Sequence, residues 1–378
     1  MSTPEEFRLR FPALADMTYL ASCSQGALSD TLAAALLEFQ HTLLRYGAPW
    51  ERWMREVDLA RKLFADLIHA SVKEIAVLPS VSSAAYQVAS TRQWRSRSRI
   101  ITTTMEFPSV AHVWLAQCAN GADVGYVADR SGVVHAEDYA AVIDERCELV
   151  SVPLISYRNG VRLPVRTVVD IARTAGAHTF VDAYQGAGVE PIDVREIGCD
   201  FLAAGSLKYL LGIPGIAFLY VRDGVQDARE PQATGWFGRR DPFEFNPREI
   251  DYPANARRFE SGTPAIPAAY GAVAGMRVLG GLDQEAVRSH VGELGAYAHD
   301  TLTGDGERLW SPAEAALRGP QVALIDANPN DLAGYLAARG IITSPRGELL
   351  RIALHHYSTA EDINAVAAAI REYRRTGG

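Results

Sequence analysis

Short apolar runs recur along the first two thirds of the chain, between segments whose apolar residues repeat every three or four positions. A short apolar run is typical of a buried strand, and the longer period is typical of an amphipathic helix. This alternation predicts a doubly wound α/β fold with a mostly parallel sheet. The strands are expected at residues 75–78, 100–103, 123–127, 149–154, 179–182 and 201–204, and helices at 86–93, 109–118 and 164–175.

One further apolar run, at 215–221, follows the preceding strand after a loop too short for a helical crossover. We therefore expect this strand to run antiparallel. Beyond about residue 265 the pattern changes to that of an α+β domain. Helices are expected there at 268–279, 283–303 and 360–375, and strands at 321–325, 340–343 and 349–353. The sequence thus predicts a large α/β domain over residues 21–264 and a small α+β domain made of 1–20 and 265–378.

Composition narrows the class of protein. The 378 residues are 48% hydrophobic and 22% charged, and the net charge of −8 argues against a nucleic-acid footprint. The scattered cysteines argue against a zinc site or a disulfide framework and favour the reducing cytoplasm. The polar, acidic N-terminus predicts no signal peptide, and no apolar run approaches the ~20 residues of a membrane span. The cysteines are Cys23, Cys118, Cys147 and Cys199.

Lysine is scarce, and one of the three lysines differs from the others. Lys62 and Lys73 have polar, helix-like surroundings, whereas Lys208 follows an apolar run and precedes small residues. A desolvated amine can lose its proton and attack a carbonyl, which a guanidinium cannot do. Lys208 is therefore predicted to form a Schiff base. The alternative is a strand-end lysine whose amine reaches water.

Ligands of doubly wound sheets bind at the carboxyl ends of strands, and several polar groups follow the predicted strands there. Ser82 and Ser83 open a helix and would bind a phosphate, or would simply cap the helix. Asp182 ends a strand next to the strand before Lys208, and it would keep a pyridinium nitrogen protonated or cap a helix. Phe107 would stack on a flat ring or belong to the core.

The order Ser-Ser, aromatic residue, Val-Asp-Ala-Tyr-Gln and Gly-Ser-Leu-Lys resembles the class V aminotransferase family of pyridoxal-phosphate enzymes, with its fold-type I architecture. Arg-Phe-Glu-Ser-Gly-Thr-Pro at 258–264 and Leu-Arg-Ile-Ala-Leu-His at 350–355 resemble two further motifs of that family. The resemblance runs through almost the whole chain. It implies pyridoxal 5′-phosphate as the cofactor and an amino acid as the substrate.

The resemblance also implies roles for matching residues. Lys208 would bind the cofactor aldehyde, and Asp182 would pair with the pyridine nitrogen. Arg351, which alone would suggest a surface ion pair, would bind the substrate carboxylate. Thr263 would reach the cofactor of a neighbouring subunit, which implies a homodimer. The other expected contacts are Ser82, Ser83, Phe107, Gln185, Ser206 and Trp236 to the cofactor, and His355 to the substrate.

Some positions depart from parts of the family. Ser206 and Phe107 stand where desulfurases and epimerase-like members have histidine, which favours the kynureninase-like members, as does Gly-Trp-Phe-Gly at 235–238. Leu207 stands where kynureninases have tyrosine, and Gly-Thr-Pro replaces their Asn-Pro-Pro. No cysteine lies between residues 321 and 351, so the sulfur-accepting thiolate of a desulfurase is missing from that segment.

We therefore expect an aminotransferase that works through a Lys208 Schiff base and a Cα carbanion. A kynureninase-like enzyme, a C–S or other β- or γ-lyase, an epimerase and a non-catalytic protein with the same fold remain alternatives. A nucleotide-binding enzyme is disfavoured because G-x-G-x-x-G and G-x-x-x-x-G-K-[ST] are missing. Residues that would choose among these reactions, each more typical of a structural or solvated position, are His112, Tyr157, Arg158, Arg239, Arg240, His355 and His356.

Overall fold

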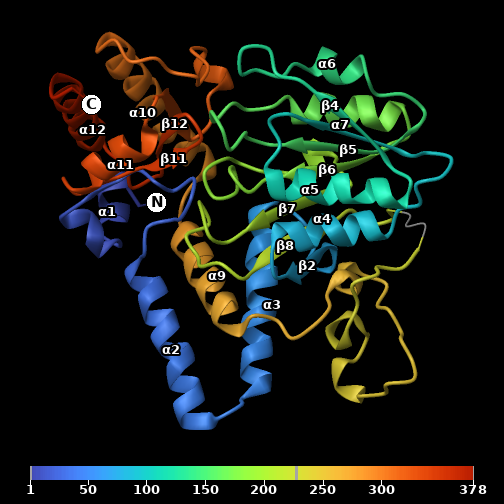
Figure 1. Ribbon diagram of the computed structural model, residues 1–378. Helices are drawn as coiled ribbons and strands as arrows, with labels where there is room; N and C mark the ends of the chain where they lie inside the picture. The colour runs from blue at the N-terminus through green and yellow to red at the C-terminus, as the bar shows by residue number, and fades with distance from the viewer. Residues whose placement is uncertain (1, 226–228, 378) are drawn as a thin grey trace.

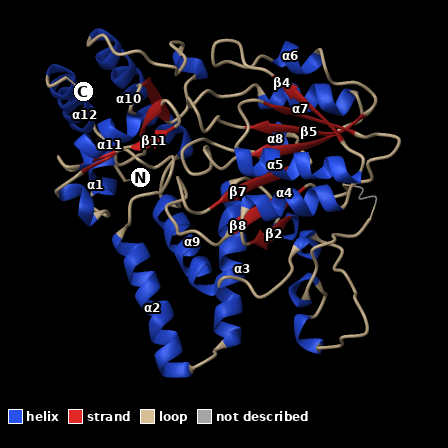
Figure 2. Cartoon of the chain, in the orientation of Figure 1, coloured by secondary structure: helices blue, strands red, loops and turns tan. Residues whose placement is uncertain are grey.

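The computed structural model describes residues 2–225 and 229–377 and contains a seven-stranded central sheet with helices on both faces (Figures 1 and 2). The strand order is β2-β8-β7-β6-β5-β3-β4. The strands are β2 (Ile75–Leu78), β3 (Arg99–Thr103), β4 (Asp123–Val127), β5 (Cys147–Pro153), β6 (His178–Asp182), β7 (Phe201–Gly205) and β8 (Ala217–Val221). The predicted strands are confirmed, with ends shifted by one or two residues.

Strand direction places the carboxyl ends of the central strands together. The pairs β3–β4, β3–β5, β5–β6 and β6–β7 are parallel. Strand β8 is antiparallel to both β7 and β2, as its short connection to β7 predicted. The chain segments that follow β3, β5, β6 and β7 therefore all leave the sheet at the carboxyl ends of its strands, where ligands of doubly wound sheets bind.

The two faces of the sheet are covered by different helices. Successive side chains of a strand point to opposite faces. In β6, Phe180 packs toward α4 and α5, whereas Val181 packs toward α3, α7 and α9. The helices are α2 (Asp30–Tyr46), α3 (Trp50–Leu67), α4 (Val81–Ser90), α5 (Pro108–Ala116), α6 (Ala136–Ala140), α7 (Val165–Thr174), α8 (Val194–Ile197) and α9 (Ile266–Leu279).

The helical predictions were right in place but incomplete. Helix α4 begins at Val81, beside the serines that were expected to open a helix, because the Ser80 hydroxyl accepts a hydrogen bond from the Ser83 N–H and caps the helix. Helices α2 and α3 were not predicted. Both pack on α9, with α2 standing out from the body of the molecule in Figure 1.

The C-terminal part has its own small sheet, β11-β12-β9, in which both strand pairs are antiparallel. The short strand β1 (Thr18–Tyr19) pairs with β10 (Ile341–Ile342), so the N-terminus lies against this part. The predicted strand at 340–343 shrinks to β10, and the limits of the two predicted domains stay a prediction. The other elements are α1 (Pro4–Arg8), α10 (Gln284–Gly304), β9 (Gln321–Ile325), α11 (Pro329–Ala337), β11 (Ser344–Arg346), β12 (Leu349–Ala353) and α12 (Ala360–Arg375).

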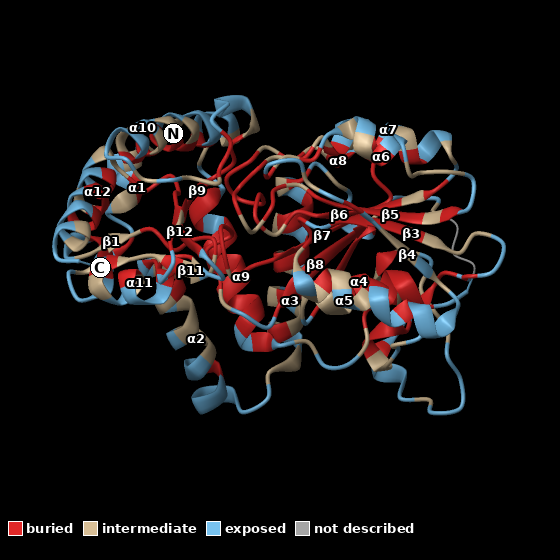
Figure 3. Ribbon diagram, turned by 45° about the horizontal axis from the view of Figure 1, so that its top comes forward, coloured by how far each residue is buried: buried red, intermediate tan, exposed pale blue. Residues whose placement is uncertain are grey.

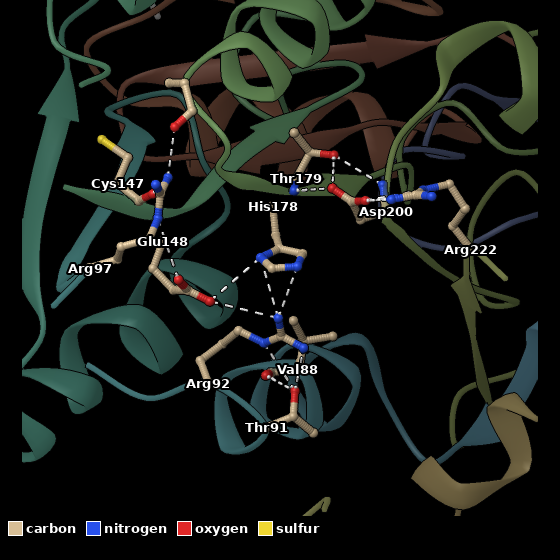
Figure 4. Close-up of polar contacts among 11 residues, drawn as sticks. Val88, Thr91, Arg92, Arg97, Cys147, Glu148, His178, Thr179, Asp200 and Arg222 are labelled. Carbon is tan, nitrogen blue, oxygen red and sulfur yellow. Dashed lines mark hydrogen bonds and ion pairs between the residues drawn. The ribbon is translucent and has the colours of Figure 1, made fainter. Parts of the chain in front are cut away.

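A network of charged and polar side chains lies at the amino ends of β5, β6 and β7 (Figure 4). The buried Arg92 guanidinium contacts the ring of His178 and lies 3.7 Å from the Glu148 carboxylate. Asp200 accepts hydrogen bonds from the backbone N–H and the hydroxyl of Thr179, at 2.8 and 3.1 Å. These charged side chains are paired with one another, so polar contacts hold this end of the sheet together.

Within residues 2–225 and 229–377, no helix has the length and apolarity needed to cross a membrane.

Candidate active site

Lys208 lies in a tight loop that follows β7 and returns the chain to β8. The Ser206 hydroxyl donates a hydrogen bond to the Ile213 carbonyl at 2.6 Å, and the Gly212 N–H donates to the Ser206 carbonyl at 2.8 Å. Gly26 packs on this loop and donates its N–H to the Leu207 carbonyl at 2.9 Å. A Cβ at Gly26 would collide with the Lys208 carbonyl, so the close approach requires glycine. The loop is therefore fixed from both sides.

The amine of Lys208 is buried, with 8% of the residue exposed. Its Nζ lies 4.2 Å from the centroid of the Tyr184 ring and 5.2 Å from that of Phe107. Burial lowers the pKa of Lys208 to about 8, against the opposing charge of Asp182 and with a further lowering by Arg351. The amine therefore loses its proton far more readily than an ordinary lysine, as a nucleophile or general base requires.

Asp182 ends β6 and is buried beside this amine. Its Oδ1 accepts the Tyr184 N–H at 2.8 Å. Burial raises the pKa of Asp182, and the Tyr184 N–H and the Lys208 charge oppose this rise. The two neighbouring strand ends therefore bring the predicted acid and lysine close enough for their charges to act on each other.

Arg351 on β12 is also buried, with 1% exposed, and no acidic residue within the described chain forms an ion pair with it. Its Nη1 donates to the Tyr157 carbonyl at 2.9 Å, and its Nη2 donates to the Ser344 hydroxyl at 2.6 Å. The alternative of a surface ion pair is wrong because the side chain is neither exposed nor paired. A buried guanidinium without a counter-ion near Lys208 suits an incoming carboxylate.

The family described as aminotransferase class-V matches residues 47–366. The chain belongs to this family. It is 38% identical over 360 residues to the "Uncharacterized aminotransferase YcbU" of Bacillus subtilis, covering 95% of each. An apo cysteine desulfurase structure from Thermococcus onnurineus NA1 superposes with a TM-score of 0.88 at 22% identity, covering 100% of this chain and 99% of that one. The predicted family and fold-type I architecture are confirmed.

A further solved structure shows a cofactor in the same fold. It is a lysine-to-alanine mutant of C-DES with glycine covalently linked to its PLP cofactor. Its TM-score is 0.88 at 18% identity, over 97% of this chain and 99% of that one. At this identity the likeness concerns the fold.

Within the described residues of this class V family member, no group of His, Cys, Asp or Glu side chains is arranged to hold a metal ion.

Glu106 is a buried acid of the site that was not selected from the sequence. Its Oε2 accepts the Ser151 hydroxyl at 2.8 Å, and its Oε1 accepts the Phe107 N–H at 2.9 Å. Burial and the charge of Asp182 raise the pKa of Glu106 to about 8. The Ser151 hydroxyl and the Phe107 N–H oppose this rise, but burial outweighs them, so Glu106 is favoured in its protonated form at neutral pH. The available signal was an acid directly after a predicted strand.

Glu106 makes stability depend on pH. In the folded state it keeps its proton while an unfolded chain loses it above about pH 4.5, so stability falls as pH rises from there toward about 8. We expect Glu106→Gln to raise the thermal midpoint relative to the wild type more at pH 8 than at pH 5. The exposed Glu137→Gln serves as the matched control. An equal shift at both pH values would show that Glu106 is ionised throughout this range.

The predicted phosphate-binding serines differ in their surroundings. The Ser82 hydroxyl makes no hydrogen bond within the described part of the chain, and it lies in the first turn of α4, where backbone N–H groups lack helical acceptors. The Ser83 hydroxyl lies 2.9 Å from that of Ser80. Ser206 already uses its proton on the Ile213 carbonyl and would have to break that bond to donate to a phosphate.

Gln185 follows Asp182 by three residues and has only one half of its amide hydrogen-bonded. Its Nε2 donates to the Cys23 carbonyl at 3.1 Å, whereas its Oε1 is buried without a hydrogen-bond partner among the described residues. A buried acceptor without a partner is costly. The amide oxygen therefore suits a ligand that brings a hydroxyl group.

The structure does not support the expected contact of His355 with the substrate. Both ring nitrogens are used, because Nε2 donates to the Tyr209 carbonyl at 3.0 Å and Nδ1 accepts the His356 N–H at 2.8 Å. The ring lies nearly parallel to the rings of Phe7 and Tyr357, with centroids 6.0 and 4.8 Å away, and burial lowers the pKa of His355 to about 3. His355 is a neutral core residue that holds α1 against the C-terminal part.

Trp236 and Thr263 have no contact with Lys208 in the described residues of one chain. Trp236 lies in a short 3₁₀ turn, and its ring packs against Trp50 and Phe245. Thr263 is exposed. In Figure 1 the yellow segment that contains Trp236 lies beyond the β2 edge of the sheet. Arg239 forms ion pairs with Glu244 and Asp251 in this segment, which agrees with the structural position that the sequence favoured for it.

Proposed function

We propose that this chain is a pyridoxal-phosphate-dependent aminotransferase that acts on an amino acid. The observation that carries this proposal is the buried Lys208 amine, which interacts with Asp182 and has the unpaired Arg351 nearby. The three side chains supply an amine that can become neutral, an acid for a protonated ring nitrogen and a clamp for a carboxylate. The name of the Bacillus subtilis relative supports amino-group transfer.

The residues present fit the cofactor. Gln185 offers the ring hydroxyl a buried acceptor that has no hydrogen-bond partner among the described residues. Ser82 and the first turn of α4 offer a free hydroxyl and backbone N–H groups for the phosphate. Phe107 offers a ring beside the amine of Lys208. When bound, the cofactor would supply an aldehyde for the lysine and a ring that accepts electrons.

Each residue of the site then has a defined task. Neutral Lys208 would take the proton from the substrate Cα and return it to the carbon that gains hydrogen. Asp182 would hold the proton of the positively charged ring nitrogen, and Arg351 would orient the α-carboxylate of the substrate. The rings of Tyr184 and Phe107 keep water from the amine.

We do not propose transfer of sulfur to a protein cysteine. The segment in which a desulfurase would carry its acceptor thiol forms the β11–β12 hairpin in this chain. Arg346 pairs with Leu349 there, across a two-residue turn. No cysteine lies in this segment. A tight hairpin without a thiol offers neither the nucleophile nor the mobility for such a transfer.

The proposal includes a homodimer, because the family resemblance implies that Thr263 reaches the cofactor of a second subunit. Thr263 is exposed and so is accessible to such a subunit. Thr263→Ala should then weaken cofactor retention without changing the spectrum of bound cofactor. Equilibrium dialysis of the purified dimer measures the retention. A monomer in sedimentation analysis, or unchanged retention, would remove Thr263 from the site.

A panel of amino acids tests the reaction type. With a reactive amino acid and no oxo acid added, an aminotransferase converts its cofactor once to the amine form and releases one oxo acid per active site. Adding a second oxo acid restores the starting spectrum. Continuous release of pyruvate or ammonia would indicate a lyase, and inversion of the amino acid would indicate an epimerase. Either result would contradict amino-group transfer.

A further inference from the structure

A cavity of about 600 Å³ opens between the hairpin of β11 and β12 and the loop that follows β5. The loop contributes Tyr157 and Arg158, and the hairpin contributes Arg346 and Glu348. The two arginines come from segments far apart in the sequence and line one space. Their convergence results from the packing of the small sheet beside the carboxyl ends of the large one (Figure 3).

The cavity adjoins the lysine site through shared residues. The Tyr157 carbonyl accepts the hydrogen bond from Arg351, and the Tyr157 ring meets the Phe107 ring edge-on, with centroids 4.9 Å apart. Phe107 in turn lies against the Lys208 amine. The positive charge of Arg346 also lowers the pKa of Lys208. A substrate held by Arg351 would therefore extend from Lys208 toward this cavity.

The cations that line the cavity have no counter-ion in the part of the chain that the structure describes. Neither Arg158 nor Arg346 forms an ion pair within residues 2–225 and 229–377. The Arg158 guanidinium lies over the Trp310 ring, with its Cζ 4.3 Å from the ring centroid, so its plane is fixed while its N–H edges stay free. Glu348 is the acid among the lining residues, and two cations oppose it. The balance favours an anionic ligand.

We propose that this cavity binds an acidic group at the far end of the substrate, so that the substrates are amino acids with a second carboxylate and the corresponding dicarboxylic oxo acids. Arg351 would hold the α-carboxylate, and Arg158 and Arg346 the distal one, each as a planar donor fork. Arg158 is half-buried and Arg346 is exposed, so both guanidinium groups are accessible to a ligand that enters the cavity. This inference rests on the proposed function and adds the substrate class.

Pairs of amino acids with equal shape but different charge test the proposal. In the wild type, glutamate should exceed glutamine, or aspartate should exceed asparagine, in kcat/KM by at least about tenfold, because charge-assisted hydrogen bonds are stronger than neutral ones. Arg158→Ala and Arg346→Ala should each lower kcat/KM for the acid by about tenfold while changing that for the amide less than about threefold. Glu348→Gln should increase the preference for the acid. Arg166→Ala, exposed on α7, is the control.

Binding without turnover gives a second readout. The dicarboxylates from succinate to adipate should raise the thermal midpoint of the holoenzyme more than monocarboxylates of equal carbon number. Arg158→Ala and Arg346→Ala should each abolish that difference. Equal effects of the two kinds of acid, a preference for the amides, or equal losses for acid and amide in the variants would each overturn the inference. Amino-group transfer from neutral amino acids would still support the proposed function.

Discussion

Replacement of Lys208 by alanine should lower kcat by about 10²- to 10⁴-fold, because the variant loses its general base as well as its bond to the cofactor. Folding should be retained, since the substitution removes a buried amine whose pKa is already lowered by burial. Turnover of the best amino acid measures the activity, and far-UV circular dichroism measures the fold.

The control for this prediction is Lys62→Ala. Lys62 lies exposed on α3 and pairs with Asp66 one helical turn away, so its loss should leave activity unchanged. If Lys208→Ala kept more than about a tenth of the wild-type kcat while folded, another group would have to be the base, and the assignment of Lys208 would be lost.

Replacement of Arg351 by alanine should cost about 2–5 kcal/mol of transition-state binding, which corresponds to a loss of about 30- to 5,000-fold in kcat/KM. The buried guanidinium makes no ion pair among the described residues, so its charge is available to the α-carboxylate. Arg351→Lys should retain part of this energy, because an ammonium keeps the charge but lacks the planar fork.

Arg351 also holds Ser344 and Tyr157, so a loss of activity alone does not identify its role. A substrate analogue that lacks the α-carboxylate separates the two explanations. If Arg351 binds that carboxylate, the wild type should favour the amino acid over its decarboxylated amine, and Arg351→Ala should lose this preference. A variant that lost activity equally toward both compounds would show that Arg351 only supports the structure.

The sequence was sufficient for the sheet and for the central pair of the site. Apolar runs located the strands because a buried parallel strand has few polar positions, and the short connection before β8 predicted its reversed direction. Asp182 and Lys208 follow adjacent strands, so sheet topology alone brings them together. Family resemblance then supplied the chemistry that a single buried lysine only suggests.

Other features depended on tertiary packing. His355 stands four residues after Arg351, yet the chain leaves β12 at Ala353, and His355 then enters the aromatic cluster around Phe7. Glu106 precedes the selected Phe107, but its burial against Asp182 appears only when β3 and β6 share a sheet. Neither the contact of His355 with Phe7 nor the burial of Glu106 near Asp182 can be predicted from the residues adjacent in the sequence.

The arginines of the cavity show the same limit. Arg158 and Arg346 come from a loop and a hairpin of different sheets, and no periodicity links them. From the sequence, Arg158 was more typical of a structural or solvated position, and Arg346 was not selected. Their relation depends on how the small sheet packs beside the large one, and this is fixed only by the whole fold.

Borohydride reduction of the purified holoenzyme, followed by peptide mass spectrometry, tests the central claim most directly. The chain has only three lysines, so the site of attachment can be assigned without ambiguity. We predict a pyridoxyl phosphate group on the peptide that contains Lys208 and none on the peptides with Lys62 or Lys73. A reduced adduct on either of those lysines, or no adduct in protein that binds the cofactor, would contradict this claim.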